Sequence, residues 1–535
     1  MRHRKLAQTA FLFPLLLTAA AHGILSSNPA PTVRIETGML RGGNFGSAAN
    51  EIAFLGIPYA APPVADLRWK APEPASKWKG TRDATKFSHS CMQPATSPFA
   101  KSQMSEDCLY LNVWTTEFSP SANLPVMVWI HGGGNYQGRG QDPPLGPGLA
   151  RMGVVVVSLN YRLGPFGFLA HEALSRESPH HSSGNYGLLD QIESLKWVQR
   201  NISEFGGDPR KVTIFGESAG ATDACLLMAS PLAAGLFRGA ILESGDCQAT
   251  LIADSKKSIP FNLIHGSGEQ QGAALSRHFG IASGPDELAK LRAIPAEQLL
   301  QAWEVDPDVV VSPIVDGWVI PEQPATIFAQ GRQASVPVIV GSNSNEGTSF
   351  ISKNNPSTLD QYEKYLARDS GKFSAEELAV YPASSDAKVP DAYLQLQTEF
   401  FGFGAYSMAR AMTRTGQKAY LYSFDFVGPD GYASQGAFHT EELFFLADAF
   451  PVNWPRTREE EKLGEAMRRY WTQFARTGNP NAKPNPPWPP YDLQFEQCMG
   501  VGREVKLKPI PGVERLVALE KIMKKVLAEE AGSED

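Results

Sequence analysis

Short apolar runs recur along the chain, and segments of mixed polarity separate them. The clearest runs lie at residues 126–130, 154–159, 212–215, 336–340 and 420–424. Because these runs are nearly continuous rather than alternating, the strands that they predict are buried on both faces, as in a parallel sheet covered by helices. The pattern therefore predicts an α/β fold with a mostly parallel central sheet. In such folds, ligands bind beyond the carboxyl ends of the strands.

One of these predicted strands leads directly into a serine turn. Residues 216–220 read Gly-Glu-Ser-Ala-Gly and follow the run at 212–215. The pattern G-x-S-x-G places a serine on a tight strand-to-helix turn with its hydroxyl exposed. Residues 219–229 are rich in Ala, Leu and Met, which predicts the helix that this turn requires. A chance match in a glycine-rich loop is the alternative, but the order of strand, turn and helix favours Ser218 as a nucleophile.

A second glycine-rich stretch, HGGGNYQG at 131–138, follows the predicted strand at 126–130. Consecutive glycines allow backbone amides to point toward one position, as an oxyanion hole requires. An ordinary flexible turn is the alternative for this stretch alone. Combined with the serine turn, it predicts that the amides of Gly133, Gly134 and Ala219 surround the oxyanion of a tetrahedral intermediate.

A nucleophilic serine also needs a base and an acid that orients the base. In this fold class the chain order is serine, acid, histidine. Only His265, His278 and His439 follow the serine turn, and room for an intervening acid favours His439. Glu346 lies in a polar loop after an apolar run, and Asp316 in SPIVDGW is the rival acid. Spacing favours Glu346 without excluding Asp316.

Several longer stretches carry a resemblance to a known family. They are FLGIPYAAPP (54–63), SEDCLYLNVW (105–114), WIHGGGNYQG (129–138), LNYRLGPFGFL (159–169), residues 184–220, NEGTSF (345–350), FHTEELFF (438–445) and YWTQFARTGNPN (470–481). With these motifs the chain resembles the type B carboxylesterases, an α/β-hydrolase family that includes cholinesterases and bile-salt-activated lipase. The resemblance covers nearly the whole mature chain.

The resemblance implies a role for each candidate residue. It selects Glu346 over Asp316 as the acid and implies a disulfide between Cys91 and Cys108. The implied catalytic set is Ser218 as nucleophile, His439 as base and Glu346 as acid, with Gly133, Gly134 and Ala219 as oxyanion donors.

The length of 535 residues would by itself suggest about three domains. A site assembled from both halves of the chain instead requires one catalytic unit. We therefore expect a single α/β-hydrolase domain over residues 24–535, with insertions that form the walls of an active-site gorge.

The first 23 residues have the features of a secretory signal peptide. A basic start precedes an apolar stretch at 11–17 and small residues, with cleavage expected near Ala21 or Gly23. The apolar stretch is shorter than the ~20 residues that span a bilayer, and the mature sequence offers no other candidate span. These features predict a protein that is secreted or periplasmic, in a compartment where disulfides persist.

The chain has five cysteines, so at least one is unpaired within the chain. Cys91 and Cys108 close a polar loop with 16 residues between them. The pairing of Cys225, Cys247 and Cys498 stays open, because Cys225 does not occupy the family's position for a partner of Cys247. The cysteine spacings are unlike those of zinc sites or C-x-x-C redox motifs, and we expect neither a metal nor a cofactor.

Charge and loop composition restrict the partners. The net charge of −7 offers no basic patch for nucleic acid, so the expected partner is a small-molecule ester. Cholinesterases carry a tryptophan in a longer loop, where it binds quaternary ammonium groups by cation–π contact. The loop from Cys91 to Cys108 has no tryptophan, and acetylcholine is therefore an unfavourable substrate.

Asn201-Ile-Ser203 is either a glycosylation sequon or the end of a helix.

Taken together, these patterns predict a secreted serine carboxylesterase that forms an acyl-enzyme intermediate. A specialised lipase or detoxifying esterase of the same family is one alternative. An adhesion or scaffold protein of the same fold is another, but such relatives characteristically lack the serine that this chain retains as Ser218. Oligomeric state is left open.

Overall fold

The computed structural model describes residues 30–99, 103–248, 252–256, 266–306, 309, 311–429, 431–454 and 456–532. The predicted signal peptide, residues 1–23, and the candidate His265 lie outside these ranges. Among the helices within the described ranges, none has the length and apolarity needed to cross a membrane.

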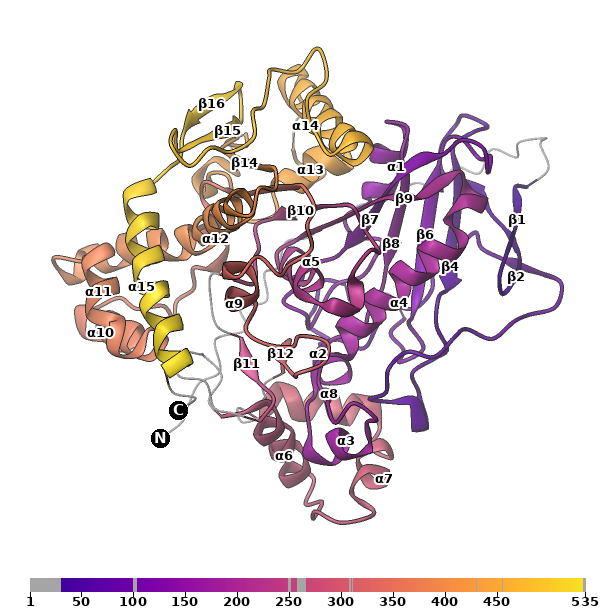
Figure 1. The fold of residues 1–535 in the computed structure, drawn as a ribbon, viewed down its shortest axis with the longest axis horizontal. Helices are drawn as coiled ribbons and strands as arrows, with labels where there is room; N and C mark the ends of the chain where they lie inside the picture. Colours follow the sequence, from indigo (N-terminus) through magenta and orange to yellow (C-terminus); the bar gives the residue numbers. More distant parts are fainter. Residues whose placement is uncertain are drawn as a thin grey trace.

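An eleven-stranded sheet forms the centre of the molecule (Figure 1). Its strands in spatial order are β16 (Val505–Pro509), β15 (Gln497–Val501), β14 (Ala419–Phe424), β13 (Val338–Asn343), β10 (Gly239–Glu243), β9 (Gly207–Glu217), β7 (Leu124–Ile130), β8 (Val155–Leu159), β6 (Tyr110–Thr115), β4 (Ile52–Pro58) and β3 (Gly43–Asn44). The strands from β15 to β8 are all parallel, and antiparallel strands flank them on both sides. The predicted mostly parallel sheet is confirmed.

All five apolar runs form strands of this sheet, namely β7, β8, β9, β13 and β14. Strand β7 shows why the runs are continuous. Its residues Val126, Val128 and Ile130 belong to one hydrophobic core, and Met127 and Trp129 belong to a second core on the opposite face. Alternate side chains of a strand point to opposite faces, so a strand covered on both sides must be apolar throughout.

Helices supply the other half of each core. On one face, α4 (Tyr186–Asn201) and α5 (Ala219–Ala229) pack on the sheet. On the other face, α1 (Leu145–Ala150), α13 (Glu442–Ala447) and α14 (Arg458–Thr477) do so. The layers are therefore helix, sheet and helix, which is the arrangement that positions a site at the strand ends.

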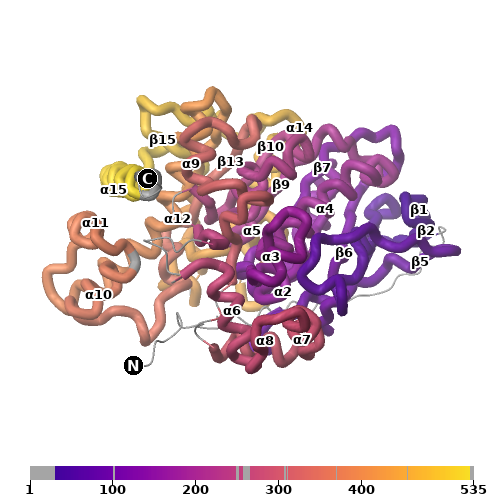
Figure 2. The backbone as a smooth tube through the Cα atoms, turned by 60° about the horizontal axis from the view of Figure 1, so that its bottom comes forward, coloured from indigo at the N-terminus to yellow at the C-terminus, as the bar shows by residue number. Residues whose placement is uncertain are grey.

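The remaining elements lie around this centre. Figures 1 and 2 both show α10 (Leu359–Asp369), α11 (Ser374–Val380) and α15 (Val513–Gly532) together at one end of the molecule, and β1 (Thr32–Ile35) and β2 (Gly38–Arg41) at the opposite end. The C-terminal helix α15 buries Leu516 and Val526 within its own chain. The elements are β1 (Thr32–Ile35), β2 (Gly38–Arg41), β5 (Thr81–Asp83), α2 (Gly164–Phe168), α3 (Glu172–Glu177), β11 (Ala253–Asp254), α6 (Gly268–His278), α7 (Glu287–Arg292), α8 (Ala296–Val305), β12 (Ile314–Val315), α9 (Pro324–Ala329), α10 (Leu359–Asp369), α11 (Ser374–Val380), α12 (Val389–Arg414) and α15 (Val513–Gly532).

Two disulfides join parts of the fold. Cys91 bonds to Cys108, with their Cα atoms 5.0 Å apart, which confirms the implied pair. Cys225 in α5 bonds to Cys247 beyond β10, and this settles a pairing that the sequence left open. Cys498 is a buried free thiol.

Asn201 is a helix end rather than an accessible sequon. It is the last residue of α4 and only 1% exposed, and its side-chain amide donates to the carbonyl of Trp197 and to the carboxylate of Glu36. Its side chain therefore stabilises the fold from within.

Candidate active site

The candidate residues gather at the carboxyl ends of neighbouring parallel strands. The loop 131–138 follows β7, Ser218 follows β9, and Glu346 follows β13 at the start of a short 3₁₀ turn. His439 lies between β14 and α13. Since β14, β13, β10, β9 and β7 are consecutive in the sheet, segments far apart in sequence meet at one edge.

Ser218 occupies a strained turn between β9 and α5. Its φ of 56° and ψ of −126° lie outside the conformations that most L-residues adopt. Gly220 permits the turn, because a Cβ at this position would collide with the carbonyl oxygen of Ile130. The amide of Ser218 donates to the carbonyl of Glu243 at 2.9 Å, which ties the turn to β10. This geometry is that of the predicted strand-to-helix serine turn.

His439 and Glu346 form a direct pair. Nδ1 of His439 donates to Oε2 of Glu346 at 2.6 Å, and both side chains are buried. The other oxygen of Glu346 accepts the backbone amide of Asn343 at 2.7 Å. The carboxylate is thus fixed through both oxygens, and it fixes the imidazole ring in turn.

The alternative acid and the alternative base have other partners. Asp316 accepts hydrogen bonds from the hydroxyl of Ser182 at 2.7 Å and from the amide of Ile320 at 2.9 Å, so it stabilises a turn. His278 pairs with Asp306 at 2.9 Å. In the described residues, the candidate acid that contacts His439 is Glu346.

The glycine-rich loop approaches the serine turn closely. Gly133, Gly134 and Asn135 all have positive φ, at 102°, 64° and 60°, which turns the backbone sharply after β7. A Cβ added to Gly132 would lie 3.1 Å from the Cβ of Ser218. The start of the loop at Gly132 therefore lies beside the serine, although the two belong to separate segments of the chain.

Sequence reasoning missed Glu217, the residue before the serine. Its Oε1 lies 3.0 Å from Nε2 of His439, so the imidazole stands between two carboxylates. Burial lowers the pKa of His439, but Glu217 and Glu346 outweigh it and raise the pKa to about 9. On the carboxyl group of Glu217 burial has the opposite effect, and it raises the pKa to about 8. The G-x-S-x-G pattern leaves this position unspecified, and a glutamate there was the available signal.

Two further carboxyl groups are buried near Glu217 and Glu346, and sequence reasoning missed them as well. Glu243 ends β10 and accepts the indole N–H of Trp471 at 3.2 Å. Glu442 begins α13 and accepts the side-chain amide of Asn343. Burial raises the pKa of Glu442 to about 7 and that of Glu243 well above its ordinary value. Glutamates within apolar stretches, as in ILESG and TEELFF, were the signal for this cluster.

Aromatic rings form an apolar wall beside the imidazole. The ring centroids of Phe350 and Phe401 lie 5.1 and 4.8 Å from that of His439. Phe401 belongs to α12 and packs edge-to-face with Phe400, which is 48% exposed. These rings extend from the histidine toward the surface.

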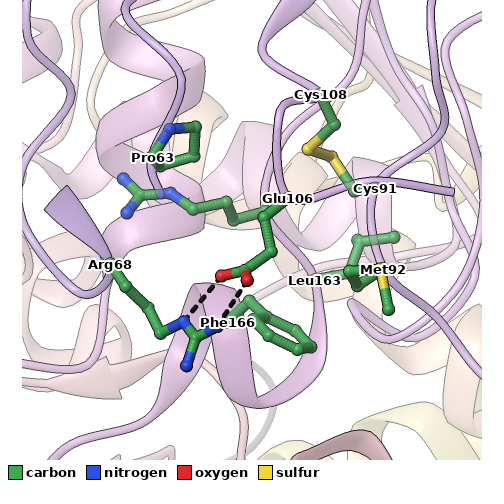
Figure 3. A pocket seen from close by; sticks show the side chains of 9 residues that line it. Pro63, Arg68, Cys91, Met92, Glu106, Cys108, Leu163 and Phe166 are labelled. Atoms are coloured by element: carbon green, nitrogen blue, oxygen red, sulfur yellow. Dashed lines mark hydrogen bonds and ion pairs between the residues drawn. A yellow bond between two sulfur atoms is a disulfide. The ribbon is translucent and has the colours of Figure 1, made fainter. Parts of the chain in front are cut away.

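A separate small pocket lies under the Cys91–Cys108 disulfide, where Arg68 and Glu106 form an ion pair (Figure 3). Its lining includes none of the candidate catalytic residues. Across the described residues, no group of three or more His, Cys, Asp or Glu side chains is arranged to hold a metal ion.

Comparison with known proteins identifies the family. A family model described as the carboxylesterase family matches residues 29–518 of the chain. The chain belongs to the carboxylesterase family. Fumonisin B1 esterase of Sphingopyxis macrogoltabida is 38% identical over 476 residues, which are 85% of this chain and 85% of the relative. Para-nitrobenzyl esterase of Bacillus subtilis (strain 168) is 37% identical over 485 residues, which are 86% of this chain and 93% of the relative.

Solved structures of esterases are also similar to this chain. A structure of PNB esterase matches with a TM-score of 0.79 and 33% identity, over 92% of this chain and 99% of that one. The esterase therefore has the α/β-hydrolase fold that the resemblance implied. It is a carboxylic ester hydrolase, as its family and relatives show.

Proposed function

We propose that this esterase acts through a triad of Ser218, His439 and Glu346 and forms an acyl-enzyme intermediate on Ser218. One observation carries the proposal. The 2.6 Å bond between His439 and Glu346 lies at the same sheet edge as the strained turn that holds Ser218. The residues contributed by both halves of the chain also support a single catalytic unit over residues 24–535.

The proposed reaction has two halves. The hydroxyl oxygen of Ser218 attacks the ester carbonyl while Nε2 of His439 accepts its proton, and the alcohol leaves with that proton. Water then attacks the acyl-enzyme with His439 as base, which releases the acid and restores the serine. Glu346 orients the imidazole and stabilises its positive charge during both attacks.

The oxyanion that forms in each half needs hydrogen-bond donors. The proposed donors are the backbone amides of Gly133, Gly134 and Ala219, two from the loop after β7 and one from the start of α5. Donors that are already oriented stabilise the developing charge without reorganisation during the reaction.

The proposed substrates are small neutral esters. Two relatives are named for their action on fumonisin B1 and on para-nitrobenzyl esters. The apolar wall of Phe350 and Phe401 beside His439 favours an uncharged group at that position. Nitrophenyl, aryl and glyceryl esters of increasing chain length separate a general esterase from a specialised lipase. In the same assay we expect choline esters to be hydrolysed much more slowly than neutral esters of the same acid.

We further propose that the enzyme is exported and lacks residues 1–23 when mature. The two disulfides support export, since disulfides persist in oxidising compartments. Sequencing of the N-terminus after expression in the native host tests this. An N-terminus at Met1 in protein recovered from the cytoplasm contradicts it.

A fluorophosphonate probe tests the catalytic proposal directly. The probe reacts with an activated serine, so mass spectrometry of the labelled wild type should place the adduct on Ser218. Labelling on another serine, or hydrolysis without labelling, contradicts the proposal.

A further inference from the structure

A buried hydrogen-bond network lies behind the glycine-rich loop. The side-chain amide of Asn135 donates to Oδ1 of Asp223 at 2.9 Å, and the side-chain amide of Gln191 donates to Oδ2 of the same carboxylate at 2.6 Å. The hydroxyl of Tyr161 lies 3.0 Å from Oδ1 of Asn135 and 2.8 Å from the carbonyl oxygen of His131. Side chains from three separate segments, at Tyr161, Gln191 and Asp223, therefore form the network that holds the loop.

The cost of burying this network indicates that it is more than a packing detail. Asp223 and Gln191 have no exposed surface, and Asn135 is 5% exposed. Burial raises the pKa of Asp223 to about 7, and the bonds from Asn135 and Gln191 counter that rise. A carboxylate in this position is costly unless donors satisfy it, and an apolar residue would avoid the cost. The presence of a carboxylate here therefore points to a role that an apolar residue cannot fill.

The position of Asp223 suggests that role. It lies on α5, the helix whose first residue is Ala219, and Asn135 directly follows Gly134. The proposed oxyanion donors come from these two segments, the loop and the helix. The bond between Asn135 and Asp223 joins them directly and spans 88 positions of sequence. Asn135 also keeps a φ of 60°, and its carbonyl accepts the amide of Gly164 at 2.7 Å.

We infer that Asp223, acting through Asn135, is a positioning residue that sets the geometry of the oxyanion hole. It holds the amides of Gly133 and Gly134 in place relative to the amide of Ala219. The inference rests on the proposed function, since it assumes that these amides bind the oxyanion. Asp223 itself takes no part in proton transfer.

Exchange of the two side chains tests the inference. Asp223→Asn leaves one acceptor oxygen for two amide donors, and Asn135→Asp sets two carboxyl groups against each other. The double exchange restores each bond, because Asn at 223 donates to Asp at 135 and still accepts from Gln191. Each single variant should lower kcat about ten- to hundredfold, with KM changed less than about threefold. The double variant should recover kcat to within about threefold of wild type.

A trifluoromethyl ketone inhibitor supplies a second readout, because its adduct with the serine carries an oxyanion. Its inhibition constant should rise in the single variants by the same factor as kcat falls, which a general loss of stability does not produce. Asn112→Asp is the matched control. Asn112 is a buried asparagine that bonds Gly56 and Ser158. That variant should lose stability with kcat nearly unchanged.

The outcomes separate the inference from the proposed function. A wild type that hydrolyses no ester overturns both. An active wild type with single variants of normal kcat, or a double variant as slow as the worse single, overturns the inference alone. Should a single variant fail to fold, the double variant still decides, since a folded and active exchange requires the predicted bond.

Discussion

The two sides of the site are built on different principles. The loop side consists of Asn135, Asp223, Gln191 and Tyr161, where one carboxylate receives two amide donors. The histidine side consists of His439, Glu217, Glu346 and Glu442, where several carboxyl groups surround one imidazole. One oxygen of Glu442, and one oxygen of Glu243 next to this side, accept no hydrogen bond from the described atoms.

This difference teaches what each side contributes. Amide-to-carboxylate bonds have fixed directions, so the loop side holds geometry. Crowded carboxyl groups act at longer range through charge, so the histidine side sets the proton affinity of His439. Variants on the loop side should therefore change kcat at every pH, whereas those on the histidine side should also change its pH dependence.

The largest effect is expected at Ser218, the proposed nucleophile on which both sides would act. Ser218→Ala should lower kcat by a factor on the order of 10⁵ or more, because no other group supplies the nucleophile. Thermal unfolding should be nearly unchanged, since the half-buried hydroxyl contributes little packing. Ser230→Ala, at the far end of α5, is the control and should stay active. Normal turnover in the Ser218 variant would show that the two sides do not meet at this serine.

The second largest effect is expected at Glu346, the proposed acid of the histidine side. Glu346→Gln keeps the shape of the side chain but cannot stabilise the imidazolium, so kcat should fall on the order of 10³ or more. Asp316→Asn is the matched control, because Asp316 bonds Ser182 and a turn, and it should cost less than about tenfold. Both variants are assayed with one activated ester, with circular dichroism to verify folding. The reverse ranking would reject Glu346 as the acid.

The sequence predicted the candidate catalytic residues but not the hydrogen-bond network of the loop side. Along the chain Ser218, Glu346 and His439 follow β9, β13 and β14, and the apolar runs of these strands are visible in the sequence. Their order along the chain restricted the choice and spacing favoured Glu346, but the family resemblance was needed to exclude Asp316. The resemblance also implied the Cys91–Cys108 bond that the structure contains.

Other features were beyond sequence reasoning for physical reasons. Strand β10 is short and ends in Glu243, so it gave little apolar signal. Without β10, nothing in the sequence placed Cys247 beside Cys225. The bond from Asn135 to Asp223 depends on how the loop after β7 meets α5, which only the folded sheet decides. Charged residues are usually exposed, so residue type alone gave no reason to expect Glu217 and Glu442 in the interior.

A pH profile tests the role of charge on the histidine side. Glu217 favours the imidazolium, so Glu217→Gln should lower the pKa of His439 from its raised value. In the proposed mechanism the neutral imidazole accepts the proton of Ser218, so activity should rise as pH rises through this pKa. The variant's rise in kcat/KM should therefore lie lower by about one pH unit or more, with the high-pH plateau within about tenfold of wild type.

The control for that profile is Glu441→Gln. Glu441 is buried nearby but accepts the amide of Phe438, and burial raises its pKa to about 9. Glu441 is not among the carboxyl groups that raise the pKa of His439, so its replacement by glutamine should leave the profile unchanged. A profile of Glu217→Gln that is unshifted, or displaced to higher pH, would separate Glu217 from the proton affinity of His439.

The smallest expected change in turnover concerns the support of the loop side. Gln93, two residues after Cys91, exchanges hydrogen bonds with both backbone groups of Gly138 at 3.0 Å. Replacing Cys91 and Cys108 together by serine should lower stability by about 3 kcal/mol, by the chain-entropy estimate for a loop of this size. The Gln93 bonds remain, so kcat should change less than about twofold while urea unfolding shifts to lower concentration. A tenfold loss of kcat would mean that the disulfide, rather than Gln93, holds this end of the loop.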